Sequence, residues 1–107
     1  MMTTIPEATF MLDLTNAGAR REVSVRGVDQ FTASVIEPAL MGSAVVTIRK
    51  VIGGQDIDFS TPVTIDSATS VAESLDVAGI EKVVFVVTTS DDTVADGHFA
   101  AYGEEDR

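Results

Sequence analysis

Apolar residues recur at every second position through most of this chain, and this period of two constrains the fold more than any other feature. In the stretch TFMLDLT, Phe10, Leu12 and Leu14 alternate with mostly polar neighbours, as in a half-buried β-strand. REVSVRGV, FTASVIEP and SAVVTIRKVI follow with strand-like patterns, and Gly, Pro, Asn or Asp turns separate them at roughly ten-residue spacing. The pattern predicts an all-β protein, an antiparallel β-sandwich or jelly-roll-like barrel of about eight short strands with little or no helix.

Turn residues suggest how the first strands connect. Asn16 and Gly18 tolerate positive φ, so a turn is expected there. Because the turn is short, the strands at residues 9–15 and 21–28 should pair as a hairpin.

Proline and glycine also mark the limits of later strands. Pro38 should end the third strand, because proline cannot donate to a β-ladder. Gly53-Gly54 should end the fourth, and the last two strands are expected at residues 81–89 and 94–102. In the stretch QDIDFSTPVTID, the side chains expected to face inward are Ile57, Phe59, Val63 and Ile65.

The segment SATSVAESLDVAGI fits two structures. A helix fits because Ser70 and Glu73 have capping-box spacing, with Val71 and Leu75 four residues apart. A strand fits because Val71, Leu75 and Val77 are in phase at period two. We favour a strand, since the surroundings are rich in strands and the segment is short for a helix.

The chain of 107 residues has the length of one domain. We expect a flexible N-terminal arm at residues 1–8, a single β-sandwich domain at residues 9–103 and an acidic tail at residues 104–107. The start, MMTTIPEATF, lacks the basic and apolar regions of a signal peptide. We therefore expect a protein that is made and used without export.

Charge and cysteine content exclude several classes of function. Seven Lys and Arg against 17 Asp and Glu give a formal charge of -10, which opposes binding to nucleic acid and to anionic membranes. The chain has no cysteine, so disulfides, a thiolate nucleophile and cysteine-based metal sites are excluded.

Few residues suggest chemistry. His98 is the one histidine, and DGHFAAY around it matches no catalytic motif. Gly53-Gly54 is not part of a phosphate-binding loop, so no cofactor is expected and the protein is not expected to be an enzyme. Acidic loops are compatible either with a cation site or with ordinary polar turns, and we favour turns. The residues of these candidate cation loops are Asp56, Asp58, Asp91, Asp92 and Asp96.

The aromatic residues indicate a core rather than a binding platform. The phenylalanines lie on different strands, mostly in phase with core positions. With no tryptophan and one tyrosine, the ring platform of many sugar-binding sandwiches is mostly missing. A carbohydrate-binding module remains an alternative, but a weakened one.

The stretch KVVFVVTT is apolar on both faces. Val83, Phe85 and Val87 point to one side of the strand, while Val84 and Val86 point to the other. A sandwich strand needs only one apolar face. The second side is therefore expected to be covered by a helix, a loop or another subunit. Because little helix is expected, we favour contact with another subunit, and the alternative is a surface with scattered valines.

The C-terminal half, with SLDVAGIEKVVFVVTTSDDTVADGHFAAYGE, resembles small all-β structural proteins of tailed bacteriophages, and the chain as a whole is similar in length and character to head decoration, or cement, proteins. The resemblance covers roughly residues 73–103. It rests on a leucine-containing strand and glycine turn before the valine-rich strand, and on the ending Ala101-Tyr102-Gly103. Some cement proteins are rich in Gly, Ala and Pro, whereas this chain has three Pro.

The resemblance implies a virion protein on the capsid surface, made in the host cytoplasm, which assembles as a trimer or other homo-oligomer. Its partners would be copies of itself and the major capsid protein, and its N-terminal arm could pair with a capsid strand. A head–tail connector, tail or head-fibre subunit is an alternative in the same class. The residues expected to make these contacts are Ile5, Pro6, Phe10, Val84 and Val86.

Overall fold

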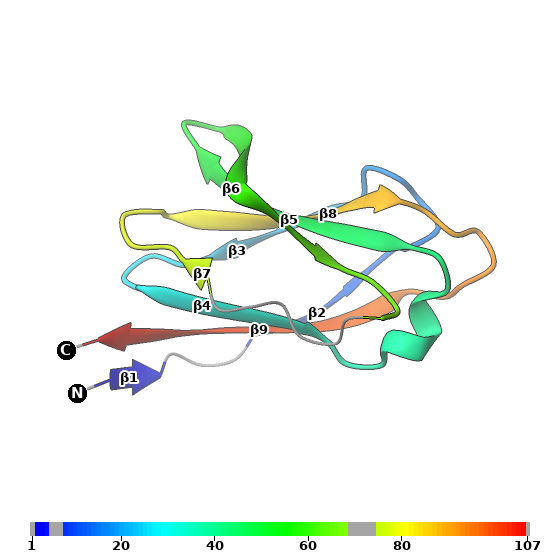
Figure 1. The fold of residues 1–107 in the computed structure, drawn as a ribbon, viewed down its shortest axis with the longest axis horizontal. Coiled ribbons are helices and arrows are strands. Elements are labelled where there is room, and N and C mark those ends of the chain that lie inside the picture. The colour runs from blue at the N-terminus through cyan, green and yellow to red at the C-terminus, as the bar shows by residue number, and fades with distance from the viewer. Residues whose placement is uncertain (1, 5–7, 69–74, 107) are drawn as a thin grey trace.

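The computed structural model describes residues 2–4, 8–68 and 75–106, which form two antiparallel β-sheets packed face to face (Figure 1). One turn of 3-10 helix is present, and within the described ranges no helix has the length and apolarity to cross a membrane. The expected all-β sandwich is thus confirmed. The elements are β1 (Met2–Thr4), β2 (Ala8–Leu12), β3 (Arg20–Ser24), β4 (Gln30–Val35), η1 (Pro38–Met41), β5 (Val45–Ile52), β6 (Gln55–Ile65), β7 (Leu75–Asp76), β8 (Lys82–Thr89) and β9 (Gly97–Asp106).

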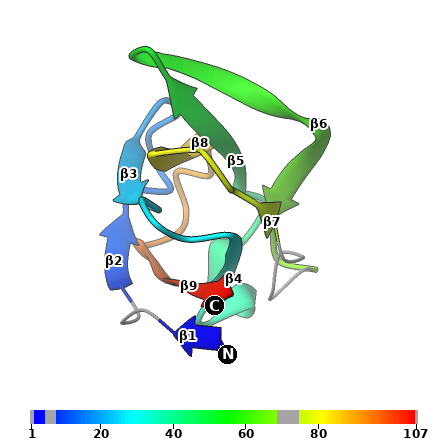
Figure 2. The same ribbon diagram turned by 90° about the vertical axis from the view of Figure 1, so that its left-hand side faces the viewer.

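Strands that follow each other in the sequence mostly belong to opposite sheets. Sheet A has the order β1-β9-β4-β7, with β2 also paired to β9, and sheet B has the order β3-β8-β5-β6. From β2 onward, every connection crosses from one sheet to the other except the β5–β6 hairpin. Figure 2 shows the two sheets end on, with the chain passing between them.

The strand order is that of a jelly roll, because the first half of the chain pairs with the second half in reverse order. The chain thus forms one long antiparallel ribbon, wrapped into two sheets. Its tip is the turn at Gly53 and Gly54, which have φ of 59° and 78°, as a two-residue hairpin loop requires. Partners along the ribbon are Phe10 and Phe99, Val23 and Val83, Phe31 and Leu75, Ile48 and Val63, and Ile52 and Gln55.

The predicted hairpin between the first two long strands is wrong. The turn forms, with Gly18 at φ 97° and the Ala19 N–H donating to the Asn16 carbonyl. However, β2 pairs with β9 and β3 pairs with β8, so the turn carries the chain between sheets. The period of two shows that one strand face is buried, and it does not identify the neighbouring strand.

The later strands follow the sequence closely. β4 ends before Pro38, the first residue of η1. In β6, Ile65 is buried and Phe59 and Val63 pack partly against the core, but Ile57 is exposed, contrary to expectation.

The ambiguous segment is described only in part. Leu75 lies in β7 and Val77 is buried. Residues 69–74, including Val71 and the possible capping box, lie outside the described residues.

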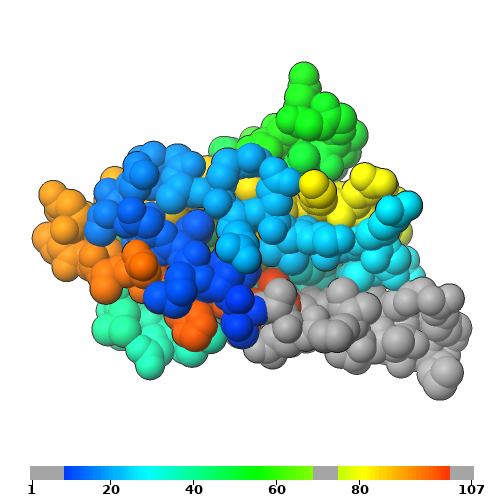
Figure 3. Space-filling model, turned by 180° about the vertical axis from the view of Figure 1, so that it is seen from behind, coloured from blue at the N-terminus to red at the C-terminus, as the bar shows by residue number. Residues whose placement is uncertain are grey.

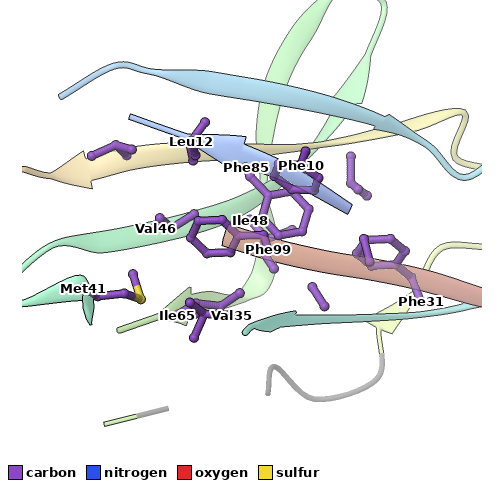
Figure 4. Close-up of a cluster of buried hydrophobic side chains, with 14 of the residues drawn as sticks. Phe10, Leu12, Phe31, Val35, Met41, Val46, Ile48, Ile65, Phe85 and Phe99 are labelled. Atoms are coloured by element: carbon purple, nitrogen blue, oxygen red, sulfur yellow. The ribbon is translucent and has the colours of Figure 1, made fainter. Parts of the chain in front are cut away.

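The core lies between the sheets and is built around phenylalanine rings (Figure 4). The Phe85 ring lies edge-on to Phe10, with centroids 4.9 Å apart, and also packs against Phe31 and Phe99. Such edge-to-face pairs stabilise beyond the area they bury. The expectation that these phenylalanines form the core is confirmed.

The two ends of the chain meet. β1 pairs with residues 104–106, which continue β9. The segments expected to be a separate arm and tail therefore include a short ladder at the end of sheet A.

Candidate interaction surface

Asp91 fastens two loops to each other. Its carboxylate accepts hydrogen bonds from the backbone N–H of Ser43 at 2.9 Å and of Thr93 at 2.9 Å, and from both hydroxyl groups. These bonds, with the Ser43 N–H the largest cause, hold the pKa of Asp91 well below its usual range. Gly42 packs against this cluster, where a Cβ would collide with Asp91 and with Val94. Asp91 therefore has a structural role in joining the turn before β5 to the loop after β8.

The other candidate cation ligands are not brought together. Asp56 pairs with Arg20 at 2.7 Å and Asp58 with Arg49 at 2.6 Å, while Asp92 and Asp96 are exposed near the β8–β9 loop. No group of three or more His, Cys, Asp or Glu side chains suited to a metal ion occurs in the described part of the chain. Asp91 holds a turn, whereas Asp56 and Asp58 form ion pairs from strand β6.

The valine-rich strand β8 is covered on its second side by its own chain. Val84 is fully buried, yet it lies outside the core cluster, on the outer face of sheet B between Glu22 and Arg49. Figure 2 shows the β5–β6 hairpin bending back over β8 toward β3. There Arg20 of β3 binds Asp56 of β6, which links the two edge strands of the sheet across its outer face.

This cover changes the interpretation of the expected contact residues. Val84 is buried under its own hairpin, Val86 is half-buried, and Phe10 is buried in the core. Val84 and Phe10 therefore offer little surface to a partner. Ile5 and Pro6 lie outside the described residues.

Sheet A has a different outer face. In one row across it, Met11 of β2 lies opposite His98 of β9, and the Ile36 N–H donates to the His98 carbonyl at 2.8 Å. The neighbouring row on the same face contains the small side chains of Thr9, Ala100 and Ser34. We call this surface the sheet A face, defined by Thr9, Met11, Ser34, Ile36, His98 and Ala100.

The sheet A face carries no Asp, Glu, Lys or Arg, although the chain has a formal charge of -10. Met11 is 53 % exposed and Ile36 is 45 % exposed. Leu40, in η1 after Ile36, is also exposed. An uncharged surface with exposed apolar side chains is typical of a protein–protein contact.

His98 lies in the middle of this face rather than in a catalytic group. It is exposed, and its side chain makes no hydrogen bond to another described residue. Within the described ranges, no hydrogen bond joins the His98 side chain to a nucleophile or an acid. The arrangement therefore supports contact with a partner and does not assemble a triad.

Sequence reasoning missed this face because it followed the buried side of each strand. The available signal was Met11, an apolar residue at an outward position of TFMLDLT. The rest of the face depends on strand pairing, which brings β2 beside β9 from the opposite end of the chain.

The structure also contains one described hollow of about 400 Å³, beside the tip of the β5–β6 hairpin. Its lining has no aromatic ring and consists of Glu22, Val51, Gly53, Gly54, Glu81 and Lys82. This hollow therefore offers no aromatic ring on which a sugar could stack.

Comparison with solved structures finds similar chains at low sequence identity. The SPBc2 prophage-derived protein YomS has 15 % sequence identity over 96 % of both chains, with a TM-score of 0.68. A structure reported for Bacillus endospore appendages, a family of disulfide-linked pili, has 15 % identity over 98 % of this chain and 89 % of that chain, with a TM-score of 0.52. A CBM51 domain from Clostridium perfringens GH95, in complex with methyl-galactose, has 14 % identity over 95 % and 92 % of the two chains, with a TM-score of 0.45. No known family and no curated protein matches the sequence.

Proposed function

We propose that the protein is a non-enzymatic structural component of a tailed-phage virion, a decoration protein that binds the outer surface of the head and stabilises the capsid. The observation that carries this proposal is the contrast between the sheet A face and the outer face of sheet B. The sheet A face carries no Asp, Glu, Lys or Arg, whereas the outer face of sheet B bears four ion pairs. A subunit lying on a lattice needs one face that binds and another that remains in water.

The fold supports the same class of function. Jelly rolls form many viral capsid domains, and the likeness to the prophage-derived protein extends over nearly the whole of both chains. This chain has no cysteine, so the disulfide linkage of the endospore pili is not open to it. Its association has to be non-covalent.

In this arrangement the sheet A face lies against the major capsid protein. The outer face of sheet B, with its ion pairs, then points to solvent, and Ile5 and Pro6 belong to the proposed capsid contact. Copies of the chain associate as a trimer or another homo-oligomer on the lattice.

The proposal predicts that a charge on the sheet A face prevents docking. Ile36→Lys should reduce binding to heads that lack the protein by about tenfold or more, because a buried, unpaired ammonium group costs several kcal/mol. Co-sedimentation of purified protein with such heads measures the effect.

The matched control is Ile57→Lys, which adds the same charge to another exposed isoleucine, in β6. It should bind like the wild type. Equal loss with both variants, or no binding of the wild type to any head, would contradict the proposed docking face. Copy number on native particles then separates a decoration protein, which covers the lattice, from a connector, which occupies one ring.

A further inference from the structure

Five of the described strands lie at sheet edges, and they differ in how they are protected from pairing. β1 is only three residues long. Exposed edges usually carry charges, proline or very short strands that prevent sheet-to-sheet association. β3 carries Arg20, Arg21 and Glu22, β6 carries Asp56, Asp58 and Pro62, and β7 is two residues long with Asp76.

β2 has none of these protections. Its five residues, Ala8–Leu12, include no charge and no proline. Its described pairing is with β9 alone, and Figure 3 shows the blue atoms of residues 9–24 at the surface on this side. An unprotected edge of this kind favours pairing with another strand.

The direction of the free backbone groups follows from the bonds on the other side of β9. The Ile36 N–H donates to the His98 carbonyl, so His98 directs its backbone groups toward β4 and Phe99 directs its groups toward β2. Phe10 lies opposite Phe99 and bonds to it. The N–H and C=O groups of Thr9 and Met11 therefore point away from β9, toward the free edge.

We propose that this edge pairs with the same edge of a second copy of the chain, antiparallel and around a two-fold axis at Phe10. In that register Thr9 lies opposite Met11 of the partner subunit. Each N–H that points outward then meets an outward C=O, so the edge is self-complementary. Sheet A becomes continuous through both copies.

Charge opposes the approach of two copies as a whole, but not within the five-residue ladder. Two chains of formal charge -10 repel each other, whereas the residues of β2 bring no charged side chain into the ladder. The charged group that lies against the strand is Arg21, 5.7 Å from the centre of the Phe10 ring. Because the two-fold axis passes at Phe10, this arginine lies near the axis in both copies and adds no attraction between them.

The contact is small. A five-residue edge buries much less than the roughly 1,600 Å² of a stable interface, so pairing should be concentration-dependent, with a Kd weaker than about 1 μM. The β2 pairing is the contact between copies in the virion function proposed above. Its biological purpose therefore rests on that proposed function. The β2 edge and the sheet A face are adjacent, so one copy can pair at the edge while its face binds a capsid.

The experiment measures molar mass by sedimentation equilibrium, up to about 1 mM protein, where such weak pairing is populated. The wild type should form a dimer, and Thr9→Pro should lower its association constant at least about tenfold. Proline removes an N–H that points outward and leaves the bonds from Phe10 to β9 in place. Met11→Lys should act in the same way by placing a charge on the edge.

Ile36→Lys is the control, since it lies on the same face but beyond β9 from the edge. It should leave the dimer unchanged. Loss of the dimer in Ile36→Lys but not in Met11→Lys would replace edge pairing with face-to-face stacking, and a wild type that stays monomeric throughout would overturn the proposal. Heads still decorated by Thr9→Pro would show that the virion role does not need this contact.

Hydrogen exchange tests the proposed edge pairing on the wild-type protein, without any substitution. The amides of Thr9 and Met11 should become protected as protein concentration rises, while the amide of Phe10 stays protected throughout. Unprotected Thr9 and Met11 amides at the highest concentration would also overturn the proposal.

Discussion

The Asp91 carboxylate joins two loops that are far apart in the sequence, and its effect on stability should depend on pH. Hydrogen bonds from Ser43 and Thr93 favour the ionised form and lower its pKa in the folded state. Its contribution to stability is therefore fully present above the unfolded value of about 3.9. It is lost as the pH falls below that value toward the lower pKa of the folded state.

Asp91→Asn should lower the melting temperature at pH 7, and the difference from the wild type should shrink as the pH approaches 3. Thermal unfolding followed by circular dichroism at several pH values tests this. Asp92→Asn is the control, because its side chain makes no hydrogen bond to another described residue, and it should leave the melting temperature nearly unchanged. A constant difference at all pH values would contradict this role for Asp91.

Sequence patterns at this scale placed Asp91 in a turn but did not identify its partner, and Asp56 and Asp58 lie in strand β6 rather than in a turn. Asp91 is one of several aspartates in the acidic loops. Its importance comes from Ser43, which lies 48 residues away. No local sequence motif spans a separation of that length.

At the scale of elements, the β5–β6 hairpin acts as a cover for sheet B. Val84 is buried beneath it as completely as a core residue. Val84→Ala should therefore destabilise the isolated protein by about 2 kcal/mol, through lost apolar burial and the remaining cavity. Val86→Ala, at a half-buried position of the same strand, should cost less.

Denaturant unfolding at low protein concentration measures both values. If Val84 were instead covered by a second subunit, its substitution would cost little in the dilute monomer. Asp56→Asn should have a small effect, about 1 kcal/mol or less, because the pair with Arg20 is partly exposed.

The two-sided apolarity of KVVFVVTT correctly indicated that something covers the second side, but the favoured cover, another subunit, is wrong for Val84, which is buried within the single chain. The sequence did not identify the cover, because the hairpin reaches over β8 through a bend and the Arg20–Asp56 pair, 36 residues apart. Similarly, alternation predicted the buried face of β2 and β3 but placed them in one hairpin instead of two sheets. Faces follow from local pattern, whereas neighbours follow from the long-range pairing of the ribbon.

At the scale of the whole molecule, strand order produces both the fold and the candidate surface. The ribbon brings residues 8–12 beside 97–101, and only then do Met11 and His98 share a face. Composition predicted an acidic protein, but the segregation of charge away from the sheet A face depends on this pairing.

That segregation leads to a salt dependence that distinguishes kinds of contact. Two copies of charge -10 repel at low ionic strength, and added salt screens that repulsion, with a Debye length falling from about 30 Å at 0.01 M to about 10 Å at 0.1 M. Because the β2 edge has no ion pair to lose, dimerisation should strengthen between about 10 and 300 mM NaCl. Association through ion pairs between subunits would weaken over the same range. Sedimentation equilibrium at fixed protein concentration measures the trend, and Thr9→Pro should remain largely monomeric at every salt concentration, since screening cannot restore the missing hydrogen bond.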